Sequence, residues 1–148
     1  RWYVSPNIGL IKFEGDEEVE DGMTLAVESS GGGVGEPTML LRALRDRYAS
    51  GGSPRGLTIL HASGLGNQAG LGSDLLSEDG LLKRVVIGHY GMTPRLSELA
   101  GENRFEAYCL PQGVISQLFR EIAAGRPGYE PRVRLEATRA IEPCCIAR

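Results

Sequence analysis

Four short runs of apolar and β-branched residues recur along the chain and predict the strands of a sheet. They occupy residues 23–28, 56–61, 84–89 and 105–110, with the sequences MTLAVE, GLTILH, RVVIGH and FEAYCL. Helical patterns or glycine-rich loops separate them. Strands of this length and spacing are typical of a folded domain with one main sheet.

Apolar residues at helical spacing predict helices in the gaps and after the last run. Residues 38–49 carry a clear helical pattern, residues 73–82 and 93–103 carry shorter ones, and residues 114–125 carry an apolar stripe that Gly125 should end. This alternation predicts an α/β fold, with a mainly parallel sheet and helices on both faces.

Glycines are concentrated directly after the first predicted strand, in the segment ESSGGGVGEP at residues 28–37. Glycine is costly in regular elements, so such a cluster indicates positive φ or a close approach to the backbone. A glycine loop that leads into a helix presents backbone N–H groups, which can receive an anion or a developing oxyanion. A tight turn without any ligand is an equally good interpretation of the local sequence.

The loops that follow the other strands also favour a shared crevice. They read ASGLGNQAGLG, YGMTP and PQG, and ligands of parallel sheets bind beyond the carboxyl ends of the strands. In the last of these loops, an exposed Gln112 could donate a hydrogen bond to a carbonyl or carboxylate. Glu36, which precedes Pro37, suits the first turn of a helix, where an acid favours the helix dipole.

Two further patterns suggest other chemistry. The segment GLGNQA, residues 64–69, fits the dinucleotide fingerprint, but glycines interrupt the helix that should follow, and the next strand ends in His89 and Tyr90 rather than an acid. His61 and His89 end two strands at the same edge and could form a metal or acid–base pair. Structural histidines are the favoured interpretation, because no carboxylate or cysteine lies beside either one.

Composition narrows the class of protein. The 148 residues are 41% hydrophobic and 24% charged, which suits one soluble globular domain. A net charge of −3 without a basic stripe argues against nucleic acid as a partner. No run is long enough to span a membrane and no signal-peptide core is seen, so a cytoplasmic protein is expected. The three cysteines indicate neither a disulfide framework nor a metal site.

In this order, the motifs resemble the N-terminal half of a family I coenzyme A transferase, of the acetate or propionate CoA-transferase group. The matching segments are DGMTLAV with its glycine loop, GSPRGLTILHASGLGN, EDGLLKRVVIGHYGMTPRLSELAGEN and EAYCLPQGVISQLFREIAAGRPG, together about residues 21–128. Residues 1–20 are expected to be an irregular acidic segment. Residues 129–148 are expected to be a divergent or disordered tail.

The resemblance implies a covalent transfer of coenzyme A. In this family, an enzyme glutamate attacks an acyl-CoA thioester, and the resulting anhydride becomes an enzyme–CoA thioester that donates CoA to a second carboxylic acid. Acyl-CoA and a carboxylic acid would be the small-molecule partners, with CoA as a substrate and no separate cofactor. By similarity, the substrate-binding residues would be Gly31, Gly32, Gly33, Val34, Gly35, Glu36, Gln112 and Gly113.

The sequence also departs from the family pattern. The family's nucleophile lies in a second half, in a motif of the form E-[STN]-G-x-x-G, which these 148 residues do not contain. Glu28 follows the first strand of the first half, so no catalytic residue is assigned, and the second half is expected as a missing partner. A homo-oligomer is left open. The alternatives are an inactive fragment, a module that binds CoA or an acyl group, and a nucleotide-binding domain.

Overall fold

The computed structural model describes residues 19–27, 29, 31, 32 and 34–125. The tail expected at 129–148 and most of the acidic segment expected at 1–20 lie outside this part of the chain. In order, the elements are β1 (Thr24–Ala26), α1 (Thr38–Gly51), β2 (Leu57–His61), the 3₁₀ helix η1 (Gly72–Leu76), β3 (Leu82–Ile87), α2 (Pro94–Gly101), β4 (Glu106–Cys109) and α3 (Gln112–Ala123).

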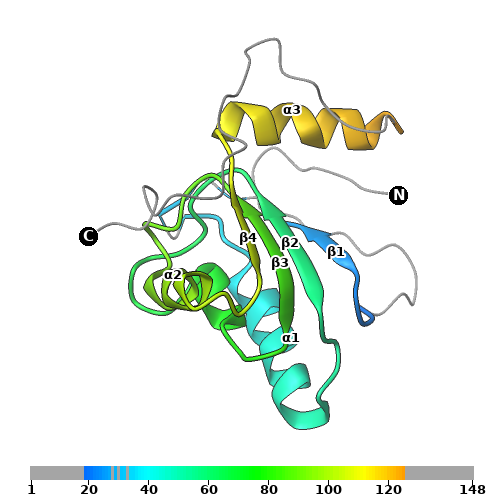
Figure 1. Cartoon of the computed structure of the whole chain (residues 1–148), viewed down its shortest axis with the longest axis vertical. Coiled ribbons are helices and arrows are strands. Elements are labelled where there is room, and N and C mark those ends of the chain that lie inside the picture. The colour runs from blue at the N-terminus through cyan, green and yellow to red at the C-terminus, as the bar shows by residue number, and fades with distance from the viewer. Residues whose placement is uncertain (1–18, 28, 30, 33, 126–148) are drawn as a thin grey trace.

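The four strands form one parallel sheet in the order β1–β2–β3–β4, which confirms the predicted α/β class. Parallel neighbours need a crossover, and crossovers of this kind are right-handed. The three crossovers step in the same direction across the sheet, so crossovers of one hand place α1, η1 and α2 on the same face, which agrees with their shared core and with Figure 1.

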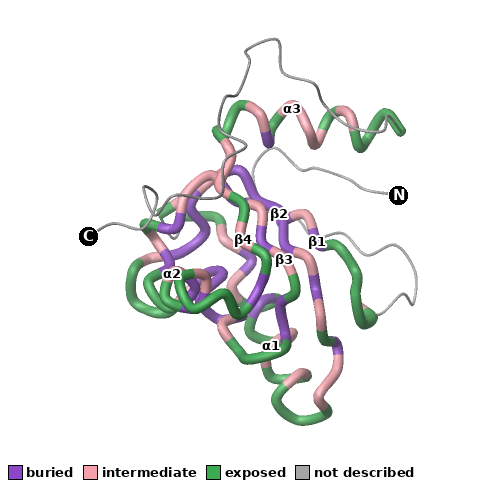
Figure 2. Tube along the Cα trace, viewed as in Figure 1, coloured by how far each residue is buried: buried purple, intermediate pink, exposed green. Residues whose placement is uncertain are grey.

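The main core lies between that face and its helices. Leu41 of α1, Leu76 of η1 and Leu96 of α2 are fully buried and belong to one cluster with the inward-facing residues of the strands. Each such side chain stabilises the fold by about 1.5–3 kcal/mol. In Figure 2 the buried segments accordingly run through the centre of the sheet and the adjoining helices.

The fourth helix, α3, contributes to the opposite face. Its Ile115 is fully buried and forms a second cluster with Leu60 of β2 and with Ala62, which directly follows β2, so helices contact both faces. Figure 1 shows α3 beyond the carboxyl end of β4. Further along this face, Arg84 and Glu106 form an ion pair at 2.6 Å, and Tyr108 is 45% exposed.

Two elements differ from the sequence-based prediction. The helical pattern expected over residues 73–82 forms only the short 3₁₀ helix η1, and β3 begins at Leu82 rather than residue 84. Leu81 and Leu82 fit the end of the helical pattern of apolar residues, but the carbonyl of Leu81 accepts a hydrogen bond from the Leu57 N–H at 2.9 Å. Pairing with β2 therefore overrides the local helical pattern. The end predicted for the last helix is confirmed, with Gly125 at φ +68° just after α3.

Candidate functional site

The loops at the carboxyl edge of the sheet lie together, as predicted. A methyl group placed on Gly31, in the loop after β1, would lie 3.6 Å from the carbonyl oxygen of Gly64, in the loop after β2. A methyl group on Gly88, at the end of β3, would lie 2.6 Å from Cγ of Gln112 in α3. Loops from all four strands thus border one edge of the sheet.

The loop after β1 depends on left-handed backbone conformations. Gly31, Gly32 and Gly35 have φ values of +78°, +63° and +68°, a region that costs other L-residues roughly 1–2 kcal/mol. A turn at its centre is closed by the Val34 N–H, which donates to the Gly31 carbonyl at 3.2 Å. Among the described residues, apart from the chain neighbours of Gly32, no atom lies within 4 Å of the position that a Cβ at Gly32 would take, so this part of the structure leaves the loop open there. Glu28 and Gly33 lie outside the described residues.

Polar contacts join this loop to the loop after β2. Ser63 Oγ donates to the Ser29 carbonyl at 3.1 Å. Within the glycine loop itself, Ser29 Oγ accepts from the Gly31 N–H at 3.1 Å. At the other end of the glycine loop, Glu36 Oε1 accepts a hydrogen bond from the Gly66 N–H at 2.7 Å. The glycine loop is therefore attached to its neighbour on both sides.

Glu36 does not cap α1 in the way its position before Pro37 suggested. The helix begins at Thr38, with Pro37 as its N-cap, no side-chain capping bond and no acid in its first turn. The carboxylate instead reaches across to Gly66, 30 residues further along the chain. The expectation that Glu36 lies in the first turn of the helix is therefore wrong, because the residue precedes the N-cap and its carboxylate binds the Gly66 N–H.

The segment GLGNQA adopts a turn that does not suit dinucleotide binding. Asn67 Oδ1 accepts hydrogen bonds from the N–H groups of Ala69 and Leu71 at 2.9 and 3.1 Å, and no helix begins between residues 64 and 71. The segment is joined to the loop after β3, where Gln68 donates its N–H to the Met92 carbonyl at 2.9 Å. The N–H groups of Gln68, Ala69 and Leu71 are therefore hydrogen-bonded within the protein.

His61 has a structural role, as predicted. The ring is fully buried, with Nδ1 2.6 Å from the Ser63 carbonyl oxygen and Nε2 3.4 Å from Ser73 Oγ. Burial lowers the pKa of His61 to about 4, so the ring is neutral at physiological pH. Ser73 is also buried and donates its hydroxyl to the Leu65 carbonyl at 2.9 Å, so this Ser–His pair is not placed as an accessible nucleophile.

His89 lies nearer the open edge. It is half-buried, and its ring packs directly over Gly64, because a methyl group there would lie 2.2 Å from Cε1. Across the described residues, no group of three or more His, Cys, Asp or Glu side chains is arranged to hold a metal ion. His61 therefore contacts a backbone carbonyl and His89 packs against a glycine.

The remaining two predicted site residues begin α3. Gln112 and Gly113 are exposed, and the helix has no side-chain cap at this end. The side chain of Gln112 packs over Gly88 through its Cγ atom, which keeps it at the edge shared by β2 and β3. The site therefore combines backbone donors, one amide side chain and one carboxylate.

This combination of fold and site defines an α/β protein whose parallel sheet carries glycine-rich loops at the carboxyl edge, where such sheets bind ligands. The family described as Coenzyme A transferase matches residues 16–131, and the chain belongs to this family. Among the helices that the structure describes, none is long and apolar enough to cross a membrane.

Curated relatives and solved structures agree with this assignment. The chain is 44% identical over 110 residues to the acetate CoA-transferase YdiF of Escherichia coli K12, and 34% identical over 117 residues to the caffeate CoA-transferase of Acetobacterium woodii. These matches cover 74% and 79% of this chain but only 21% and 22% of the relatives. The chain therefore spans about a fifth of their length.

The fold matches the same group of enzymes. The crystal structure of acyl-CoA transferase YdiF from E. coli O157:H7, a thioester complex with CoA, superposes with a TM-score of 0.71 at 43% identity. The match covers 75% of this chain and 23% of that one. The apoenzyme structure of the same protein gives an equal TM-score.

Proposed function

We propose that the chain forms part of an enzyme that transfers coenzyme A between a short-chain acyl-CoA and a carboxylic acid. The observation that supports this most directly is the glycine loop of Gly31 to Gly35, held open at the sheet edge by contacts on both sides. Membership of the coenzyme A transferase family and relatives named as acetate and caffeate CoA-transferases support the same activity. We keep a cytoplasmic location as part of this proposal.

The proposed reaction needs a nucleophile and donors for negative charge. A glutamate oxygen attacks the thioester carbon, a C–O bond forms, the C–S bond breaks, and CoA leaves as a thiolate. The thiolate then attacks the glutamyl carbonyl of the anhydride, releasing the first carboxylate and leaving an enzyme–CoA thioester. The acceptor acid repeats these steps in reverse. Each attack develops an oxyanion that preorganised N–H donors stabilise.

The roles within this chain would be binding and orientation. Backbone groups of the glycine loop would line the acyl and carboxylate pocket, and the amide of Gln112 would add a polar neighbour from the start of α3. The nucleophile would come from the family's second half, with the motif E-[STN]-G-x-x-G. The proposed substrate-binding residues are Gly31, Gly32, Gly33, Val34, Gly35, Gln112 and Gly113, of which Gly33 lies outside the described residues. Glu36, which the resemblance groups with them, instead binds the Gly66 N–H and is given a positioning role below.

A binding module without transferase activity is the second candidate. It is favoured by one observation, that the 148 residues contain no copy of the nucleophile motif. Such a module would still offer the glycine loop to CoA or to an acyl group. The two candidates differ in whether a covalent adduct can form.

The test is transfer of CoA from acetyl-CoA to propionate, together with borohydride trapping of the enzyme–CoA thioester. We expect the 148-residue chain alone to give neither product nor adduct, because N–H donors polarise a carbonyl but cannot form an anhydride. Addition of a separately expressed second half from a close homologue should restore both. An adduct on the chain alone that Glu28→Gln abolishes would assign the nucleophile to this chain instead. If both halves together bind CoA without transfer, the binding module is the better account.

A further inference from the structure

We propose that Glu36 is a positioning residue that holds the glycine loop in place by binding the Gly66 amide. The effect on catalysis rests on the function proposed above, but the structural role does not. Glu36 ends the loop after β1, and Gly66 lies in the loop after β2. The 2.7 Å contact between Glu36 Oε1 and the Gly66 N–H therefore joins the two loops that border the open edge.

The chemistry of this contact makes it stronger than an ordinary turn bond. A carboxylate that accepts a backbone N–H forms a charge-assisted bond, roughly twice as strong as one between neutral groups. Glu36 is half-buried, and its Oε2 atom is shielded from solvent, where low polarity strengthens such bonds further. A carboxylate turned inward in this way is oriented toward the protein rather than toward a ligand arriving from solvent.

Gly66 offers Glu36 a fixed point of attachment. A methyl group on Gly66 would lie 2.4 Å from the Met92 carbonyl oxygen, so its backbone lies tightly against the loop after β3. That contact is reinforced by Gln68, whose side chain donates to the Gly91 carbonyl at 3.1 Å. Glu36 thereby links the glycine loop to two neighbouring loops.

The contacts of Ser29 and Glu36 lie on either side of the glycines of this loop. Ser29 is bound by Ser63 before Gly31, and Glu36 is bound by Gly66 after Gly35. Glycines in the intervening segment have the largest backbone entropy to lose on ordering. Groups that stabilise an oxyanion must be held to within about 0.5 Å of their working geometry. Hydrogen bonds at both ends of the loop hold its backbone N–H groups in position, so no side chain has to occupy the space beside Gly32 for this purpose.

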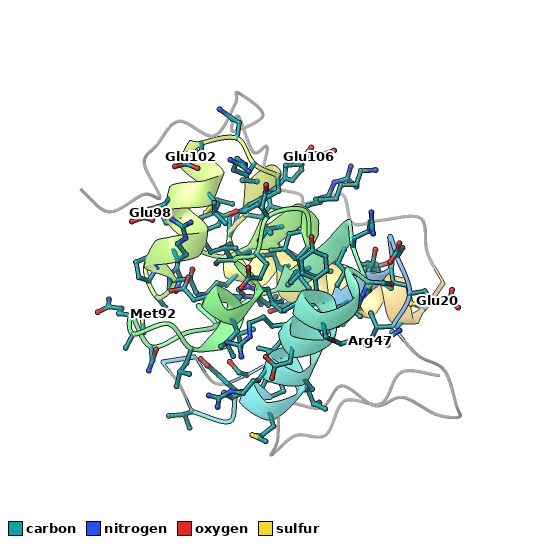
Figure 3. All side chains as sticks on the ribbon, turned by 90° about the horizontal axis from the view of Figure 1, so that it is seen from below. Glu20, Arg47, Met92, Glu98, Glu102 and Glu106 are labelled. Carbon is teal, nitrogen blue, oxygen red and sulfur yellow. The ribbon has the colours of Figure 1, made fainter. Side chains whose placement is uncertain are left out.

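Amide hydrogen exchange in the 148-residue chain tests the structural role. The reporters are the N–H groups of Gly31 and Val34, which are hydrogen-bonded within the loop. We expect Glu36→Ala to raise their exchange rates at least about tenfold and Glu36→Gln, which keeps an acceptor oxygen, to raise them less. Glu98→Ala is the control, because Glu98 lies at the periphery on α2 and pairs with Arg95 (Figure 3).

Unchanged exchange at Gly31 and Val34 in folded Glu36→Ala protein would overturn the proposal. If Glu36→Ala does not fold, Glu36→Gln provides a second test, because it keeps an acceptor oxygen and nearly the same shape. The Gly66 N–H, which donates to Glu36 Oε1 in wild type, should exchange faster in Glu36→Gln than in wild type, because a neutral acceptor binds it less strongly. Equal exchange of the Gly66 amide in the two proteins would contradict the contact.

Kinetics of the two halves combined test the effect on catalysis. Positioning predicts that Glu36→Ala lowers kcat for acetyl-CoA about 10- to 100-fold with little change in KM for propionate, and that Glu36→Gln restores most of the rate. If the charge contacted substrate, Glu36→Gln would lose as much as Glu36→Ala and KM for propionate would change, which would overturn the proposal. Absence of transfer in the wild-type pair would count against the proposed function, while the exchange result would stand by itself.

Discussion

At the scale of single residues, burial determines how His61 responds to pH. Its pKa of about 4 in the folded chain lies below the ordinary value of 6.5, mainly because burial penalises the charged ring and secondarily because His89 is near, while its bond to Ser63 acts the other way. The unfolded chain therefore binds more protons between these pH values. Stability is full above about pH 6.5 and falls as pH decreases toward 4.

We predict that this loss reaches roughly 3 kcal/mol in the free energy of unfolding. Urea denaturation at about pH 7.5 and pH 4.5 measures it. His61→Gln, which keeps a donor for the Ser63 carbonyl but does not titrate, should have a flatter pH dependence than wild type. His89→Gln is the matched control and should keep most of the wild-type slope. Equal slopes in wild type and His61→Gln would contradict this assignment.

Local sequence predicted where the site residues lie, but not the contacts between them. The glycine loop and Gln112 were placed at one edge from strand order and loop composition alone, because parallel strands bring their carboxyl ends together. The contact from Glu36 to Gly66 had no local signal, since it joins residues that are far apart in sequence. The pairing of Ser29 with Ser63 was missed for the same reason.

At the scale of elements, periodicity predicted most of the fold. All four strands and the helices α1, α2 and α3 form where alternation and helical spacing indicated. The pattern failed where tertiary pairing competed with it, as at Leu82, which joins β3 instead of a helix. A short apolar run is compatible with either structure, and only its neighbours in space decide between them.

The junctions of β3 and β4 with their loops give a prediction at this scale. A methyl group on Gly88 would lie 2.2 Å from the Ala62 carbonyl oxygen, whereas one on Gly113 would meet no atom of the described residues within 4 Å outside the adjacent backbone of its own helix. We expect Gly88→Ala to destabilise the fold by about 1–3 kcal/mol, because β2 and β3 must separate locally. Gly113→Ala should be neutral or stabilise by up to about 1 kcal/mol, because alanine favours a helix.

Thermal unfolding of the two variants measures this difference. Both substitutions add the same methyl group at the same edge of the sheet, so the pair isolates the effect of the neighbouring backbone. Equal melting temperatures for Gly88→Ala and Gly113→Ala would mean that β2 and β3 are not packed as closely as described.

At the scale of the whole molecule, the buried clusters lie within a continuous part of the chain. Among the residues that the structure describes, the fully buried core residues run from Val27 in the loop after β1 to Ile115 in α3. This part contains the described site residues and lies within the family match of residues 16–131, and the segment aligned to YdiF spans only about a fifth of that relative. A fold of this kind can hold the glycine loop in position, while the proposed reaction needs residues from elsewhere.

The last prediction separates the contribution of α3 from that of the tail. Residues 129–148 show no clear period in sequence, so we expect a chain ending at Gly128 to melt within about 2 °C of the full chain. A chain ending at Pro111 lacks Ile115 and uncovers Leu60 and Ala62. That loss should cost roughly 3 kcal/mol and lower the melting temperature by about 10 °C or more. Hydrogen exchange in the full chain provides an independent check, with fast exchange expected from Glu130 onward. Strong protection there, or equal destabilisation by both truncations, would show that the tail is a structural element whose packing its sequence pattern does not reveal.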